Sequence, residues 1–129
     1  MDKVTHFHIP VDDMARAKKF YKSIFGWEIK ETGMGMDYQL ATTVAVNEKG
    51  IPEEPGAVNG ALYLRENPEE CPSIVINIPS IDEYLKNIEK AGGKVVWPKS
   101  PVGDFGFYAQ VADTERNVIG LWEDVKKPE

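Results

Sequence analysis

Two histidines spaced one residue apart carry the clearest chemistry in this sequence. His6 and His8 are its only histidines, and they lie in the apolar segment HFHIPV. Side chains two residues apart on a strand point to the same side, so both imidazoles are expected on one face and Phe7 on the other. Neutral imidazoles can donate and accept hydrogen bonds, act as an acid–base pair, or bind a metal. The structural alternative is a pair of histidines that hydrogen-bond to polar neighbours.

The elements that must position these rings come from a weak internal repeat. The segment VDDMARAKKFYKSIFGWEI is answered later in the chain by IPSIDEYLKNIEKAGGKVV. Each copy predicts a strand, a helix, a glycine stop and a second strand. Asp12 or Asp13 can cap the first helix, and Ser80 begins a capping box for the second. Apolar residues recur at helical spacing in both helices and are expected to pack against the strands.

The remaining strands complete two similar modules. They are predicted at residues 27–31, 37–46, 59–64, 73–78, 94–97, 107–111 and 118–122. Together with the first strand they give an α+β fold of two βαβββ modules, residues 1–66 and 72–125, in a single domain of residues 1–129. The two modules are expected to form a curved mixed sheet around a cleft. The polar sides of the strands would line that cleft with ligand-binding residues: His6, His8, Tyr63, Asn77, Tyr108, Gln110 and Trp122, with Tyr38 a further candidate.

The tryptophans divide into two groups. Trp27 and Trp97 follow a helix or its glycine stop, and we expect them to pack in the interior. Trp122 alternates with Gly120, which lacks a side chain. The glycine either opens room beneath the indole for a flat ligand to stack or merely admits a bulky neighbour.

Composition excludes several classes of protein. The chain has 129 residues, a formal charge of −6 and one cysteine, Cys71. We therefore expect one domain with no intrachain disulfide, in the reducing cytoplasm, and we find no stretch of signal-peptide or membrane-spanning type. Basic residues are scattered apart from Lys18, Lys19 and Lys22, so nucleic acid is not expected as a partner.

Three segments together carry a family resemblance: HFHIPVDDMARAKKFYKSIFGW, KVVWPKSP and DTERNVIGLWE. They resemble the vicinal oxygen chelate superfamily, which includes lactoylglutathione lyase, bleomycin-resistance proteins and extradiol dioxygenases. Within it the sequence is most similar to a mostly uncharacterised group related to lactoylglutathione lyase. The resemblance implies a glyoxalase-like fold and a homodimer. It does not fix the reaction, because the superfamily contains lyases, epimerases, dioxygenases and proteins that only bind.

The resemblance also implies where a metal would be held. In the metalloenzymes of this superfamily, one residue from each of four strands ligates a divalent ion. Those positions fall here on His6, on the strand of residues 59–64, on Ser73 and on Gly120. Only His6 has a suitable side chain, so the sequence predicts a small-molecule-binding protein without a cofactor, which sequesters a planar or aromatic compound.

Two alternatives remain open at this point. The first is a lyase or isomerase that depends on a divalent metal held by His6, His8 and a carboxylate from elsewhere. The second is a regulatory or assembly module.

Overall fold

A computed structural model describes residues 1–33, 35 and 37–125, and it has the predicted α+β organisation. The first βαβββ module consists of β1 (Lys3–Val11), α1 (Met14–Phe25), β2 (Glu28–Glu31), β3 (Tyr38–Thr42) and β4 (Asn59–Leu64). The second consists of β5 (Ser73–Asn77), α2 (Ile81–Lys90), β6 (Lys94–Val102), β7 (Gly106–Ala112) and β8 (Val118–Asp124). Contacts divide the chain into two compact units. The first unit is His6–Pro72, and the second combines Met1–Thr5 with the residues from Ser73 onward.

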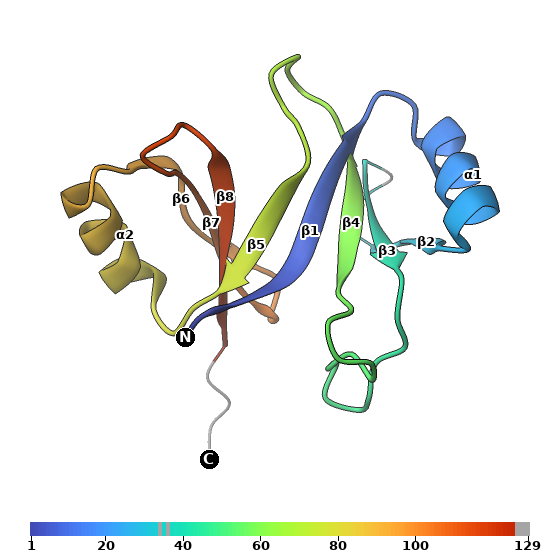
Figure 1. Cartoon of the computed structure of the whole chain (residues 1–129), viewed down its shortest axis with the longest axis horizontal. Helices are drawn as coiled ribbons and strands as arrows, with labels where there is room; N and C mark the ends of the chain where they lie inside the picture. Colours follow the sequence, from blue (N-terminus) through green and yellow to red (C-terminus); the bar gives the residue numbers. More distant parts are fainter. Residues whose placement is uncertain (34, 36, 126–129) are drawn as a thin grey trace. The chain divides into compact units, whose positions relative to one another are not determined.

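The strands of the first unit follow the order β2-β3-β4-β1 (Figure 1). β1 runs parallel to β4, whereas β3 pairs antiparallel with both β4 and β2, so this part of the sheet is mixed. The ring centroids of Phe7 and Trp27 are 5.4 Å apart, and Trp27 stacks on Tyr21 of α1 with a centroid distance of 4.9 Å. Phe7 therefore lies on the side of the sheet that faces α1. The predicted alternation of β1 is therefore confirmed.

Gly60 makes room for Phe7 on the helix-facing side. The two residues are register partners in the parallel pair of β1 and β4. A Cβ atom added to Gly60 would overlap the Phe7 ring. Glycine is thus required here by a close side-chain approach, and the ring occupies the space that a neighbouring side chain would fill.

Helix α1 is capped as predicted but is less buried than its pattern suggests. Asp13 accepts a hydrogen bond from the Arg16 N–H at 2.9 Å, and Gly26 ends the helix with a φ of 74°. Left-handed backbone of this kind favours glycine. Three apolar residues expected to pack against the strands are instead more than half exposed: Phe20 at 53%, Ile24 at 62% and Phe25 at 59%.

The second unit has a more complete core. Its strands follow the order β5-β8-β7-β6, with α2 on one face (Figure 1). The buried cluster between α2 and the strands consists of Ile78, Ile81, Ala109, Val111 and Leu121. Ser80 caps α2 through the Glu83 N–H at 3.3 Å, and the Glu123 carboxylate accepts from the Ile81 N–H at 2.7 Å. Neither helix of the described residues is long and apolar enough to cross a membrane.

The predicted strand at residues 37–46 ends early, at Thr42. The cause is Asn59, whose side-chain oxygen accepts hydrogen bonds from Thr43 N at 2.7 Å and Val44 N at 3.0 Å. Its amide also donates to the Val44 carbonyl at 3.1 Å. These bonds satisfy backbone groups that would otherwise need a strand partner, so the chain can leave the sheet there.

The predicted strand at 94–97 continues instead to Val102, through two prolines. β6 is the last strand in its order, and its register with β7 shifts twice. An edge strand with bulges tolerates residues that lack an N–H donor. Trp97 in this strand is 56% exposed, with its N–H bonded to the Ser100 hydroxyl at 3.1 Å, so the expectation of interior packing was wrong.

We predict that Gly60→Ala destabilises the protein by about 1–3 kcal/mol, the usual cost of overpacking a filled site. The reason is the overlap of the new methyl group with the Phe7 ring. Urea denaturation measures the change. In a Phe7→Leu background the same substitution should cost clearly less, and an equal cost in both backgrounds would contradict this explanation.

Candidate functional site

The sequence-predicted histidines meet at one tyrosine hydroxyl. The hydroxyl of Tyr38 lies 3.2 Å from His8 Nε2 and 3.4 Å from His6 Nε2. The two imidazole rings are 5.0 Å apart and nearly perpendicular. A hydroxyl can donate one hydrogen bond and accept others, so Tyr38 can donate to one ring and accept from the N–H of the other. We call His6, His8, Tyr38 and Tyr63 the histidine face.

Strand register explains why these side chains share a face. His8 is the partner of Ala61 in β4, and Tyr38 is the partner of Tyr63 in the same strand. Paired residues of neighbouring strands project to the same side of a sheet. Tyr38 must reach over β4 to contact β1, and Ala61, fully buried at the position beside His8, offers only a methyl group in its path.

Burial keeps both histidines neutral. Burial, together with repulsion by a positive charge on His6, lowers the pKa of His8 to about 4. Burial also lowers the pKa of His6. At neutral pH each ring therefore has one N–H donor and one bare nitrogen acceptor. The pair can exchange hydrogen bonds or protons with a bound molecule, but it has no positive charge with which to attract an anion.

Tyr63 extends the histidine face toward the segment that follows β4. Its ring lies edge-on to His8, with centroids 5.9 Å apart. In that segment lies Glu70, whose carboxylate accepts hydrogen bonds from the Glu66 and Asn67 N–H groups. Burial raises the pKa of this carboxyl, but these hydrogen bonds outweigh burial and lower the pKa below its usual value. Glu70 was missed from the sequence because it lies in a loop after the strand, where alternation gives no signal.

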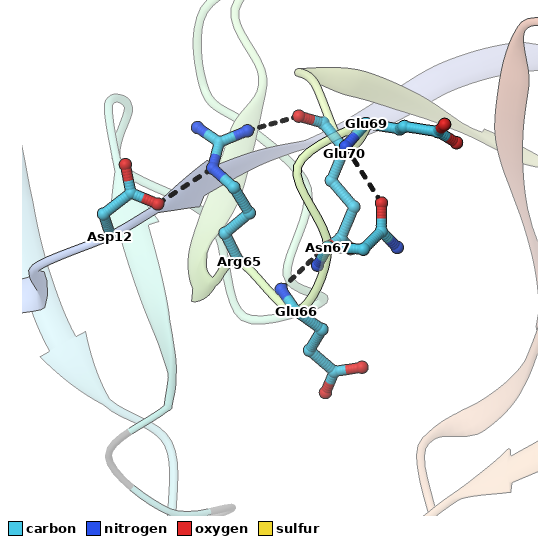
Figure 2. A network of polar contacts seen from close by, with 6 residues as sticks. All are labelled: Asp12, Arg65, Glu66, Asn67, Glu69 and Glu70. Atoms are coloured by element: carbon cyan, nitrogen blue, oxygen red, sulfur yellow. Dashed lines mark hydrogen bonds and ion pairs between the residues drawn. The ribbon is translucent and has the colours of Figure 1, made fainter.

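A small network holds Glu70 in place (Figure 2). Its carboxylate accepts from Glu66 N and from Asn67 N, the latter at 2.9 Å. Its backbone carbonyl accepts from the Arg65 guanidinium, which also pairs with Asp12 at 3.0 Å. Figure 2 shows Arg65 between Asp12 and the Glu70 carbonyl, so one side chain ties the start of the α1 region to the loop.

The other predicted ligand-binding residues belong to the second unit. Tyr108 and Trp122 are register partners, as are Gln110 and Gly120, so these positions share the face opposite α2. Gln110 donates to the Tyr108 hydroxyl at 3.0 Å, and burial raises the pKa of Tyr108. Asn77 joins the same face through Asp124, which accepts from its amide at 3.1 Å and from the Trp122 indole N–H at 2.9 Å.

The geometry decides between the two explanations of Gly120. A Cβ atom there would lie 2.9 Å from the Tyr108 ring and 3.0 Å from Val75. The Trp122 ring lies instead over Gly106, where a Cβ atom would come within 2.5 Å of it. Gly120 therefore admits the bulky Tyr108 and does not open a space beneath the indole.

Within residues 1–33, 35 and 37–125, no group of three or more His, Cys, Asp or Glu side chains is placed to hold a metal ion. Asn59 is the β4 partner of His6, and its side-chain amide is hydrogen-bonded to the backbone of Thr43 and Val44. The Glu70 carboxylate, in the loop after β4, accepts from the backbone N–H groups of Glu66 and Asn67.

Comparisons with known proteins agree with the fold. Residues 3–39 match the family described as bleomycin resistance protein-like N-terminal. Over 118 residues the chain is 31% identical to "Putative glyoxylase CFP32" of Mycobacterium bovis, with 86% of this chain and 41% of that protein covered. The same identity and coverage hold for the protein of that name from Mycobacterium tuberculosis. The chain thus spans about two fifths of the length of the curated relatives that it matches.

Solved structures are similar at lower identity. Methylmalonyl-CoA epimerase from Mycobacterium tuberculosis has a TM-score of 0.63 at 15% identity, covering 95% of this chain and 88% of that one. Hypothetical protein BH1468 from Bacillus halodurans has 0.66 at 15%, covering 99% and 98%. A glyoxalase/bleomycin resistance protein/dioxygenase superfamily member from Vibrio splendidus has 0.63 at 11%, covering 97% and 100%. At these identities the likeness establishes the fold alone.

The buried, neutral His8 predicts an acid-sensitive stability. The unfolded chain takes up a proton on this residue below pH 6.5, whereas the folded protein resists until about pH 4. The contribution of the neutral, buried His8 to the free energy of unfolding is therefore fully present above the unfolded pKa of 6.5. It is lost as the pH decreases from 6.5 to about 4. Between about pH 7.5 and about pH 5, urea denaturation should show wild type losing about 2 kcal/mol more than His8→Gln. Equal losses in the two proteins would contradict a neutral, buried His8.

Proposed function

Because the chain belongs to the vicinal oxygen chelate superfamily, we propose that it binds a small, uncharged, planar organic molecule on its histidine face, without the four-ligand metal of the superfamily's metalloenzymes. The observation that carries this proposal is the pair of neutral imidazoles that share the Tyr38 hydroxyl. Neutral donors and acceptors orient a polar group of a ligand without demanding charge on it.

The surroundings of this pair support a flat, partly apolar ligand. The edge-on rings of Tyr38 and Tyr63 lie within 6 Å of His8. Leu40 lies two residues after Tyr38 in β3, so its side chain projects to the same face, where it is 43% exposed. Few polar groups on a mainly apolar and aromatic surface are typical of small-molecule sites. On the second unit, we propose Asn77, Tyr108, Gln110 and Trp122 as a separate set of ligand-binding residues.

An isomerase or lyase is the second candidate. Imidazoles and a hydroxyl at hydrogen-bond distance can move a proton to and from a substrate. The sequence relative named "Putative glyoxylase CFP32" and the structural neighbour methylmalonyl-CoA epimerase both bear names of enzymes. These names support an enzyme as much as they support a binding protein of the same fold. Its metal-dependent form requires a carboxylate in addition to His6 and His8, and the described residues place none beside them in a metal-binding group.

We predict that acridone, a neutral planar fluorophore with one N–H and one carbonyl group, binds the protein. Tyr38→Phe, which removes the shared hydroxyl, should weaken binding about tenfold, the worth of one well-placed hydrogen bond. Fluorescence titration measures the dissociation constant. Tyr21→Phe is the matched control, since this ring stacks on Trp27 on the opposite side of the sheet. Undetectable acridone binding, or equal effects of the two substitutions, would count against the histidine face as the site.

A metal titration separates the two candidates. Adding Zn²⁺, Ni²⁺ or Mn²⁺ to protein freed of metal should leave the ring resonances of His6 and His8 unchanged, because two imidazoles alone fall short of a catalytic metal site. Elemental analysis of protein purified without chelator should likewise find no stoichiometric divalent ion. One tightly held ion per chain, with both histidine signals displaced, would replace the binding proposal by the metal-dependent enzyme.

A further inference from the structure

We propose that the Tyr38 hydroxyl fixes His6 and His8 in opposite tautomers, so that His6 binds an N–H or O–H group of the ligand through a bare Nδ1. This inference rests on the proposed function, since it assigns one atom of the histidine face to the contact with the ligand. It makes Tyr38 a positioning residue, and it narrows the ligand to planar molecules with a hydrogen-bond donor at their edge.

One hydroxyl contacts two ring nitrogens on this face. The Tyr38 oxygen lies 3.2 Å from His8 Nε2 and 3.4 Å from His6 Nε2. A hydroxyl has one proton, so it can donate to only one of these nitrogens. If the other nitrogen were also bare, its lone pair would face a lone pair of the oxygen. At least one of the two rings therefore has its proton on Nε2.

Cooperativity favours a proton on Nε2 of one ring alone. In opposite tautomers the contacts form the chain N–H···O–H···N, in which the hydroxyl accepts from one ring and donates to the other. Each bond of such a chain polarises the next and strengthens it. Two N–H groups directed at the same oxygen would lack this gain, because they compete for one acceptor. The rings are nearly perpendicular, at 87°, which suits a hydroxyl whose proton and lone pairs point in different directions.

The two distances indicate which ring has the proton on Nε2. Hydroxyl donors form shorter hydrogen bonds than N–H donors, and the shorter contact is that of His8. Tyr38 is therefore the donor to His8 Nε2, and His6 Nε2–H is the donor to Tyr38. Since burial keeps both rings neutral, each has one proton. The proton of His8 is then on Nδ1, and Nδ1 of His6 is bare.

His6 is the more accessible ring of the pair. It is half-buried, whereas His8 is only 9% exposed. In the part of the chain that the structure describes, the hydrogen bond of His6 is the one between its Nε2 and Tyr38. A bare nitrogen at a half-buried position is an acceptor for a donor group of a bound molecule. The ligand atom that fits it is the hydrogen of an N–H or O–H group.

Long-range proton–nitrogen NMR of the ligand-free protein at neutral pH tests the tautomers. Wild type should show the N–H of His6 on Nε2 and that of His8 on Nδ1, and His8→Gln, which leaves one histidine in the chain, assigns the signals. In Tyr38→Phe, His8 Nε2 should take the shift of a nitrogen that accepts no hydrogen bond. Tyr21→Phe, on the opposite side of the sheet, should leave both rings as in wild type. The same tautomer in both rings, or the reverse order, would overturn the proposal.

A pair of ligands tests the role of His6 Nδ1. 10-Methylacridone lacks the N–H of acridone and keeps its carbonyl and its flat rings. Wild type should bind it about tenfold more weakly than acridone. His6→Gln keeps an N–H for Tyr38 but lacks Nδ1, so it should bind both ligands with the weaker affinity. A methyl group that merely clashed would lower the affinity equally in both proteins, and such an equal ratio would overturn the role of His6.

The two measurements separate this inference from the proposed function. The predicted tautomers without detectable acridone binding would reject the binding proposal and retain the positioning role of Tyr38. Acridone binding that is weakened by Tyr38→Phe but is indifferent to the N–H of the ligand would retain the binding proposal and reject His6 Nδ1 as the ligand-binding atom. Tautomers other than those predicted would reject the positioning role whatever the ligand data show.

Discussion

Burial of two imidazoles beside a single hydroxyl is the constraint on which the account of this protein depends. Water is excluded from most of His8, and the charged form of a ring is costly there. The neutral form is acceptable only if its nitrogens have partners, and the Tyr38 hydroxyl contacts Nε2 of both His6 and His8. The same arrangement stabilises the fold and gives the face its chemistry, because donors and acceptors are held in place without net charge.

The fold supplies this arrangement through small residues at two positions of β4. Gly60 admits the Phe7 ring on the helix-facing side, which anchors β1 with its histidines on the other side. Ala61 leaves the path open through which Tyr38 reaches the histidines. Gly120 serves the second unit in the same way by admitting Tyr108. Both units thus use glycine to let one aromatic ring pack closely against a neighbouring strand.

Local patterns in the sequence predict the alternation of β1, the caps of both helices and the βαβββ order of each module. These features depend on neighbours within a few residues. The contact of Tyr38 with His8 is not predictable in this way, because it crosses a strand that comes later in the chain. Glu70 and the exposed Phe25 were missed for related reasons: a loop carboxylate has no periodicity, and helical spacing does not reveal how much of an apolar face the sheet covers.

Nitrogen NMR of the histidine rings at neutral pH tests the central claim most directly. In wild type the account predicts, for both His6 and His8, two widely separated nitrogen shifts, as expected of a neutral ring with one N–H and one bare nitrogen. In Tyr38→Phe the Nε2 shifts of both rings should change while the rings stay neutral. Two similar shifts in either ring, the mark of an imidazolium, or a Tyr38→Phe spectrum identical to wild type, would contradict it.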